Sequence, residues 1–176
     1  MHGVLLYGPP AAGKDAVTAA LHHLEPSYAL FPRLKAGPGR ATGYRMTDMA
    51  TINELRRSGD VVWENRRYGA VYAIDRPFLL ESLRSHVPVV HVGQPEAVGA
   101  VIDATTPASW LKVSLWCPRE TARTRLIARG STDIADRLRA WDETAPLTHA
   151  DLALDTSHAS PTEAARQIRR LASLAA

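Results

Sequence analysis

The sequence has very few of the residues that would suit an oxidising compartment or a membrane. Cys117 is the only cysteine among 176 residues, so an intramolecular disulfide is excluded and a cytoplasmic location is expected. We expect its side chain to fill a small apolar space. No apolar run approaches the roughly 20 residues that span a bilayer, so no membrane partner is expected. The first residues, MHGVLLYGPP, lack the basic start of a secretion signal.

Lysine is also scarce, because Lys14, Lys35 and Lys112 are the only three and the other basic residues are arginines. The net charge is only +3, and the arginines are interspersed with acidic residues. Nucleic-acid-binding surfaces usually gather basic residues in a patch, so no nucleic-acid partner is expected. Against this background, a lysine inside a glycine-rich segment is informative, and Lys14 lies in one.

The composition is that of an ordinary globular domain, with 45% hydrophobic and 22% charged residues. Short β-like runs alternate with helical stretches, which is typical of a parallel sheet covered by helices. The predicted class is therefore α/β, with a helix over residues 14–24. The five expected strands are at residues 3–7, 28–31, 88–92, 110–116 and 152–154.

Local signals mark the helix boundaries. Capping boxes, in which a hydroxyl and a carboxylate satisfy free backbone amides reciprocally, are expected at Thr51 with Glu54 and at Ser160 with Glu163. Gly130 is expected to close the helix that precedes it. Three prolines are placed to open helices at their first position, namely Pro77, Pro95 and Pro118.

The strongest chemical signal is the segment GPPAAGKD at residues 8–15, which we call the phosphate loop. It follows an apolar strand and precedes a helix, as the G-x-x-x-x-G-K-[ST] motif requires. Glycines let backbone amides surround phosphate oxygens, and the Lys14 ammonium would neutralise the β and γ phosphates of ATP. The residues expected to bind ATP are Gly8, Pro9, Pro10, Ala11, Ala12, Gly13, Lys14, Asp15 and Ala16.

The last position of the motif departs from the pattern. Asp15 stands where a Ser or Thr hydroxyl would bind magnesium. A carboxylate this close to the ATP phosphates would be repelled unless a cation lay between them. We therefore expect Mg²⁺ as a second cofactor, with Asp15 as its ligand, directly or through water.

From about residue 3 to 157, the order of segments resembles guanylate kinase and its relative, ribose 1,5-bisphosphate phosphokinase. The stretch GYRMTDMATINELRRSGDVVWENRRYGAVYAI is similar to the family's acceptor-binding insertion, and LIARGSTDIADRLRAWDE is similar to its lid. HADLALDTS is similar to the strand that leads to the adenine pocket. The resemblance implies a three-layer P-loop kinase in one domain, residues 1–176, with the insertion at 33–74 and the lid at 130–136.

The resemblance also implies which arginines act in catalysis. Arg129 and Arg137 match the two lid arginines and would act with Lys14. A phosphoryl group in transfer spreads its charge over three oxygens, and guanidinium groups fit it well. Arg125 shares a helix face with Arg129, but a solvated surface charge is the favoured interpretation for it.

Positive charge and hydroxyl groups gather before the helix of the insertion, as a phosphorylated acceptor requires. A monophosphate is already ionised, so it needs no general base to act as a nucleophile. The partner expected is thus a small-molecule phosphate acceptor, most simply a nucleoside monophosphate. The residues expected to bind it are Arg33, Lys35, Tyr44, Arg45, Glu64 and Tyr72.

Two departures keep the identity of the acceptor open. VVHVGQPEA offers Gly93 and Gln94 where guanylate kinases carry an acidic residue, and this is closer to the ribose bisphosphate kinases. Ile74 stands where a hydroxyl residue helps guanylate kinases to recognise guanine. A ribose phosphate, the hydroxyl of a sugar, nucleoside or antibiotic, and a non-catalytic binding module remain alternatives. The sequence does not predict the oligomeric state.

Overall fold

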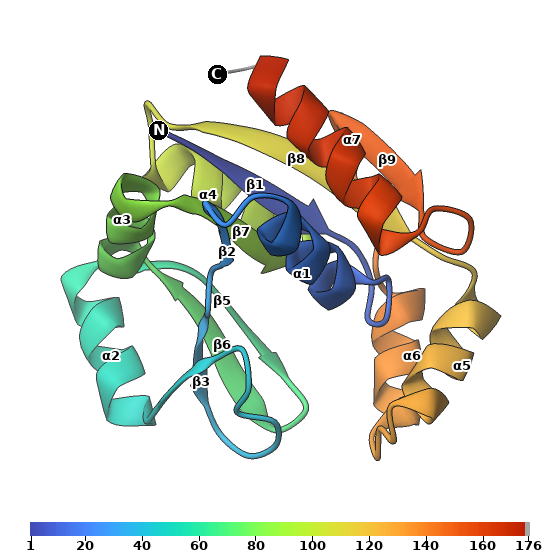
Figure 1. The fold of residues 1–176 in the computed structure, drawn as a ribbon. Helices are drawn as coiled ribbons and strands as arrows, with labels where there is room; N and C mark the ends of the chain where they lie inside the picture. Colours follow the sequence, from blue (N-terminus) through green and yellow to red (C-terminus); the bar gives the residue numbers. More distant parts are fainter. Residues whose placement is uncertain (175–176) are drawn as a thin grey trace.

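The computed structural model describes residues 1–174 and has a five-stranded parallel sheet at its centre (Figure 1). The strand order is β2-β7-β1-β8-β9, so the first strand lies in the middle. The strands are His2–Tyr7 (β1), Tyr28–Leu30 (β2), Val87–Val92 (β7), Ser109–Trp116 (β8) and Leu152–Asp155 (β9). The predicted α/β class and its five parallel strands are confirmed.

Strand β1 is buried on both faces, which explains its unbroken apolar sequence. Val4 and Leu6 belong to one buried cluster, whereas Leu5 and Tyr7 belong to another. Side chains of a strand alternate between the faces of the sheet, so a sheet covered on both sides needs continuous hydrophobic strands.

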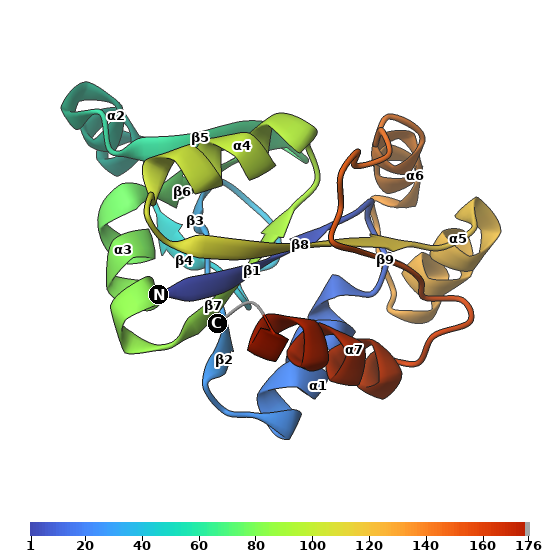
Figure 2. The same ribbon diagram turned by 90° about the horizontal axis from the view of Figure 1, so that it is seen from above.

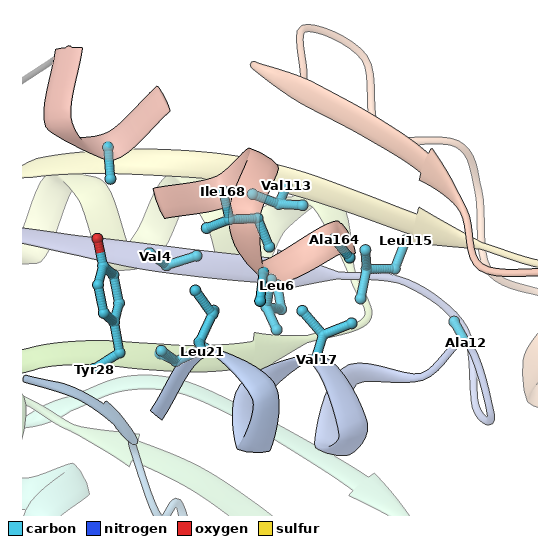
Figure 3. Close-up of a cluster of buried hydrophobic side chains, with 13 residues drawn as sticks. Val4, Leu6, Ala12, Val17, Leu21, Tyr28, Val113, Leu115, Ala164 and Ile168 are labelled. Atoms are coloured by element: carbon cyan, nitrogen blue, oxygen red, sulfur yellow. The ribbon is translucent and has the colours of Figure 1, made fainter. Parts of the chain in front are cut away.

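Helices α1 (Lys14–Leu24) and α7 (Pro161–Leu174) cover one face of the sheet. Leu21 of α1 and Ile168 of α7 pack against Val4 and Leu6, and all four are fully buried (Figure 3). Burying an aliphatic side chain of this size contributes about 1.5–3 kcal/mol. This layer therefore fixes α1, and with it the phosphate loop, against the sheet.

Helices α3 (Arg76–Ser85) and α4 (Pro95–Ala104) lie on the opposite face (Figure 2). Beyond them is a second sheet of four strands in the order β4-β3-β6-β5, with helix α2 (Met49–Ser58) packed on it. Its strands are Leu34–Ala36 (β3), Arg45–Thr47 (β4), Val61–Arg67 (β5) and Ala70–Asp75 (β6). These strands were not predicted, because two of them are too short to show an alternating pattern.

Helices α5 (Arg119–Ala128) and α6 (Ile134–Asp142) stand side by side near the carboxyl ends of the central strands (Figure 1). Gly130 has a φ of 69° and follows the end of α5, as predicted for a closing glycine. Across residues 1–174, no helix combines the length and the apolar character needed to cross a bilayer.

The helix starts confirm one capping box and correct the other. The Ser160 amide donates to Glu163 Oε2 at 2.8 Å, and the Glu163 amide donates to Ser160 Oγ at 3.2 Å. Helix α2, in contrast, is capped by Asp48, whose carboxylate accepts from the Thr51 amide at 2.8 Å. The predicted pairing of Thr51 with Glu54 is wrong, because Thr51 already lies inside the helix.

The predictions for the three helix-opening prolines are confirmed only in part. Pro95 is the first residue of α4, as expected, whereas Pro77 is the second residue of α3. Pro118 is the cap residue of α5 and not its first residue. Cys117, just before it, is fully buried, which confirms its predicted place in an apolar space.

Candidate active site

The candidate site lies at the topological switch point of the central sheet, where β7 and β8 pair with opposite edges of β1. Ligands of open α/β sheets bind at the carboxyl ends of the strands at such a point. The phosphate loop occupies this point, and its Gly8 amide donates to Val92 O at 3.2 Å. A cleft of about 1270 Å³ extends from the loop to the second sheet and to α6.

The phosphate loop has the backbone conformation that its glycines allow. Gly8 has a φ of 151°, and a Cβ there would lie 2.2 Å from Leu115 O, so no other residue fits without a shift. Gly13 is the N-cap of α1, with a φ of 91°. The free amides of the first turn of α1 therefore begin at the cleft, where they favour an anion. The predicted ATP-binding residues that line the cleft are Gly8, Pro10, Ala11, Gly13, Lys14, Asp15 and Ala16, whereas Pro9 and Ala12 do not.

The Lys14 ammonium is held over its own loop. Its Nζ donates to Gly8 O at 2.5 Å and to Pro9 O at 2.9 Å. Burial, together with the nearby Arg33 guanidinium, lowers the pKa of Lys14 to about 8. A phosphate in the loop would offer this cation stronger acceptors than two neutral carbonyls.

Asp15 follows Lys14 and is more than half exposed at the cleft. Its Oδ2 accepts from Arg40 Nη1 at 3.2 Å, and its Oδ1 lies 3.5 Å from His91 Nδ1. Burial raises the pKa of Asp15, but the Arg40 and Lys14 cations, with the His91 ring beside them, outweigh that effect and the pKa is lowered. An ionised, exposed carboxylate fits a hard divalent cation. Within residues 1–174 no three His, Cys, Asp or Glu side chains gather to hold an ion, so phosphate oxygens would have to complete its coordination.

His91 is a residue of the site that sequence reasoning missed. It lies in β7, its side chain is 12% exposed, and its Nε2 is 2.7 Å from Thr18 Oγ1. Burial and the Lys14 charge lower the pKa of His91 to about 3, so the ring is neutral. The signal that could have found it is a single histidine near the end of the otherwise apolar strand VPVVHV.

Arg125 was predicted to be a solvated charge, and the structure corrects that prediction. Its Nη1 donates to Ala11 O at 3.0 Å and to Thr156 Oγ1 at 2.9 Å, and its Nη2 donates to Thr156 O at 2.6 Å. Arg125 thus joins the phosphate loop to the segment that follows β9. Spacing along the helix could not reveal this, because both partners lie far from Arg125 in the sequence.

The two lid arginines reach the same cleft as Lys14. Arg137 Nε donates to Asp133 Oδ1 at 2.6 Å, and its guanidinium carbon lies 4.6 Å from the centre of the Tyr68 ring. Arg129 Nε donates to Ser131 Oγ at 2.8 Å. Burial and the Arg137 charge lower the pKa of Arg129, as expected for two cations in one cleft.

Four of the six predicted acceptor residues line the same cleft as Lys14. The Arg33 guanidinium lies 5.9 and 5.4 Å from the ring centres of Tyr44 and Tyr72, and Lys35 Nζ lies 5.6 and 5.7 Å from the same rings. Lys35 is buried and donates to Arg40 O at 2.8 Å. We call Arg33, Lys35, Tyr44 and Tyr72 the acceptor cluster.

The structure does not bring the other two, Arg45 and Glu64, to the cleft. Arg45 is paired with Asp75, which is buried and needs a counter-charge. Glu64 accepts from Arg56 through both oxygens, at 2.8 Å each, so its carboxylate is already fully engaged with helix α2. Neither role could be judged from sequence, because each partner comes from another element of the second sheet.

Comparison with known proteins gives the fold and no closer relationship. No family model and no curated protein matches the sequence. The guanylate kinase from Anaplasma phagocytophilum matches the structure with a TM-score of 0.61, at 11% identity, over 98% of this chain and 85% of that chain. The protein APE1195 matches with a TM-score of 0.58, at 17% identity, over 98% of this chain and 93% of its own. The protein therefore has an α/β fold of the P-loop kinase type.

Proposed function

We propose that this protein transfers the γ-phosphoryl group of ATP to a phosphorylated small molecule, with a nucleoside monophosphate as the expected acceptor. The observation that carries the proposal is one cleft that gathers two groups of cations. Lys14 and the lid arginines form one group, and Arg33 and Lys35 of the acceptor cluster form the other. Two anions that meet in one cleft are what phosphoryl transfer between a nucleotide and a phosphate requires.

The acceptor cluster favours a phosphate because no carboxylate of the described residues neutralises its two cations. Within residues 1–174, Arg33 and Lys35 form no ion pair with a carboxylate, and they face two tyrosine rings instead. Such cations keep N–H groups available for an anion, and a phosphate accepts several of them. A neutral alcohol would not need this charge, and it would need a general base.

The residues at and near the phosphate loop then have distinct roles in the proposed reaction. Lys14 would move from its carbonyl partners to the β and γ phosphates, and Arg129 and Arg137 would stabilise the charge on the group in transfer. Asp15 would hold Mg²⁺, which neutralises charge on the β and γ oxygens when it is bound. Residues 33–74 would act as the acceptor-binding insertion, and the lid at 130–136 would exclude water.

Guanine is not part of the proposal. Glu64 is engaged by Arg56 and Ile74 is fully buried, so neither is available to a purine edge. The acceptor cluster would recognise the phosphate of the acceptor and not its base. A ribose phosphate is therefore the alternative acceptor.

The test is a screen of acceptors with ATP and Mg²⁺, measured as ADP formation and as the mass of the product. GMP, AMP and ribose 1,5-bisphosphate represent phosphorylated acceptors, and nucleosides and aminoglycosides represent neutral hydroxyls. We expect turnover with a phosphorylated acceptor and a loss of about 100-fold or more in Lys14→Ala. Lys112→Ala is the matched control, because Lys112 faces Asp151 at 3.5 Å outside the cleft. Turnover with neutral hydroxyls alone, or an active Lys14→Ala, would overturn the proposal.

A further inference from the structure

His91 is fixed between two residues of helix α1. In strand β7 it pairs with Leu6 of the neighbouring strand β1. Its side chain lines the cleft together with the phosphate loop. Nε2 lies 2.7 Å from Thr18 Oγ1, and Nδ1 lies 3.5 Å from Asp15 Oδ1. Asp15 and Thr18 are one helical turn apart and share a face of α1. The imidazole thus connects strand β7 to two neighbouring positions on this helix.

For a neutral ring, only one arrangement of hydrogens satisfies both contacts. The Thr18 hydroxyl donates to Nε2, which leaves the hydrogen on Nδ1 directed at the Asp15 carboxylate. The opposite tautomer would place the Nδ1 lone pair against a negative oxygen. At 3.5 Å the Nδ1 contact is longer than a good hydrogen bond, and a small rotation of the half-exposed Asp15 side chain would shorten it.

The Asp15 carboxylate is therefore held on both sides. His91 faces Oδ1, and Arg40 donates to Oδ2 at 3.2 Å. Without these partners, the carboxylate could turn toward the Lys14 ammonium beside it. The imidazole donates a hydrogen without carrying a formal charge, so it orients the carboxylate and leaves its negative charge to another cation.

We propose that His91 is a positioning residue, which turns the Asp15 carboxylate toward the divalent cation that accompanies the nucleotide. This inference rests on the proposed function, since it takes a nucleotide with its metal as the ligand. Residues that orient a metal ligand through a hydrogen bond commonly change metal affinity by about 10–100-fold when they are replaced. Nothing in the phosphate-loop motif itself points to His91, because the residue comes from another strand.

Two substitutions separate the two contacts of the ring. His91→Asn places its amide nitrogen near the position of Nδ1, so it keeps a donor toward Asp15 and loses the contact with Thr18. His91→Gln reaches the position of Nε2, so it keeps the contact with Thr18 and loses the donor toward Asp15. Thr18→Val keeps the shape of Thr18 and removes the hydroxyl that fixes the tautomer. Circular dichroism of each variant establishes that it is folded.

The measurement is the Mn²⁺ affinity of the complex with ADP, by electron paramagnetic resonance, beside the ADP affinity in EDTA by calorimetry. We expect His91→Gln to weaken Mn²⁺ binding about 10–100-fold and His91→Asn to stay within about threefold of the parent. Thr18→Val should weaken it in the same direction as His91→Gln. The ADP affinity in EDTA should change little in all three.

Equal Mn²⁺ affinities of the parent and a folded His91→Gln would overturn the inference and leave the proposed function intact. If Asp15→Asn binds Mn²⁺ as tightly as the parent does, the inference fails together with the role of Asp15 as a metal ligand in the proposed function. If His91→Gln does not fold, an unchanged affinity in Thr18→Val overturns the inference. If ADP does not bind the parent with or without metal, the proposed function fails together with the inference.

Discussion

The guanidinium of Arg125 holds two loops that are remote in sequence. It donates to Ala11 O in the phosphate loop and to both oxygens of Thr156 after β9. A fork of donors in one plane can do this, whereas an ammonium has no comparable geometry. The shape of the phosphate loop therefore depends on a side chain from α5.

Arg125→Lys should lower both the stability of the protein and its affinity for ADP. It keeps the charge but leaves carbonyl oxygens without donors, so we expect a loss of about 1–3 kcal/mol in the free energy of unfolding. The ADP affinity should fall about tenfold, because the loop loses its support. Urea denaturation and calorimetry measure the two effects. Arg123→Ala is the control, since Arg123 is exposed and contacts only Glu120 on its own helix. Equal losses in both variants would contradict this role for Arg125.

The lowered pKa of Lys14 gives a pH dependence with a definite sign. Its ammonium is charged below a pH of about 8 and neutral above it in the free protein. Bound phosphate stabilises the charged form, so ADP affinity in EDTA should fall as the pH rises from 7.5 to 9.5. The phosphate itself is fully ionised in this range, since its second pKa is about 6. Lys14→Met should bind weakly and with a flat profile, and parallel slopes for the two proteins would contradict the assignment.

At the scale of the residue, sequence reasoning identified side chains that lie in continuous motifs. Lys14 and Asp15 were found because loop and helix together fix where they lie. Arg45 and Glu64 were misjudged because a buried aspartate and a helix arginine neutralise them, and neither partner lies in the motif. A charge on its own predicts a binding site only while its partners are unknown.

At the scale of the element, the β5–β6 hairpin and helix α6 contact each other beside the cleft. Arg67 Nη1 donates to Glu143 Oε2 at 2.7 Å, just past the end of α6. Tyr68 at the hairpin tip has a φ of 53°, which residues other than glycine rarely adopt, and the Arg137 guanidinium stacks over its ring. These contacts join the sheet that carries the acceptor cluster to α6, whose first residues belong to the proposed lid.

Arg67→Ala should raise the fraction of ATP that is hydrolysed by water instead of being transferred. An exposed ion pair contributes about 0.2–1 kcal/mol, so the closed arrangement should lose up to about fivefold in population. The ratio of free phosphate to phosphorylated acceptor measures the change. Arg66→Ala is the control, because Arg66 is exposed on the same strand and successive residues of a strand face opposite sides. The role of the pair is refuted if both variants keep the ratio of the parent.

Element prediction succeeded where burial imposes a long pattern. The central strands are apolar because helices cover both faces, so they were recognised directly. Strands β3 and β4 have three residues each and are held by pairing with distant neighbours, which no local window contains. The second sheet was therefore visible in the sequence only as a resemblance and not as strands.

At the scale of the whole molecule, the cleft is a product of two sheets and a helix pair. The central sheet supplies the phosphate loop, the second sheet supplies the acceptor cluster, and α5 and α6 supply the arginines. Figure 1 shows the second sheet and the helix pair α5–α6 on the same side of the central sheet, next to each other in the view. Patterns in the sequence predicted the phosphate loop. How the loop, the acceptor cluster and the arginines come together depends on contacts between residues far apart in the sequence, which no local pattern contains.

The buried thiol of Cys117 can report local opening of the structure around the phosphate loop. The thiol is fully buried, its Sγ lies 3.8 Å from Ala11 O, and burial raises its pKa. An alkylating reagent can reach it only when the segments that cover it open, and the phosphate loop is one of them, so the labelling rate measures the free energy of that opening. Since the chain has no other thiol, each labelled molecule records one such event. ADP at about 100 times its Kd should slow the labelling about 100-fold if it binds the closed loop alone.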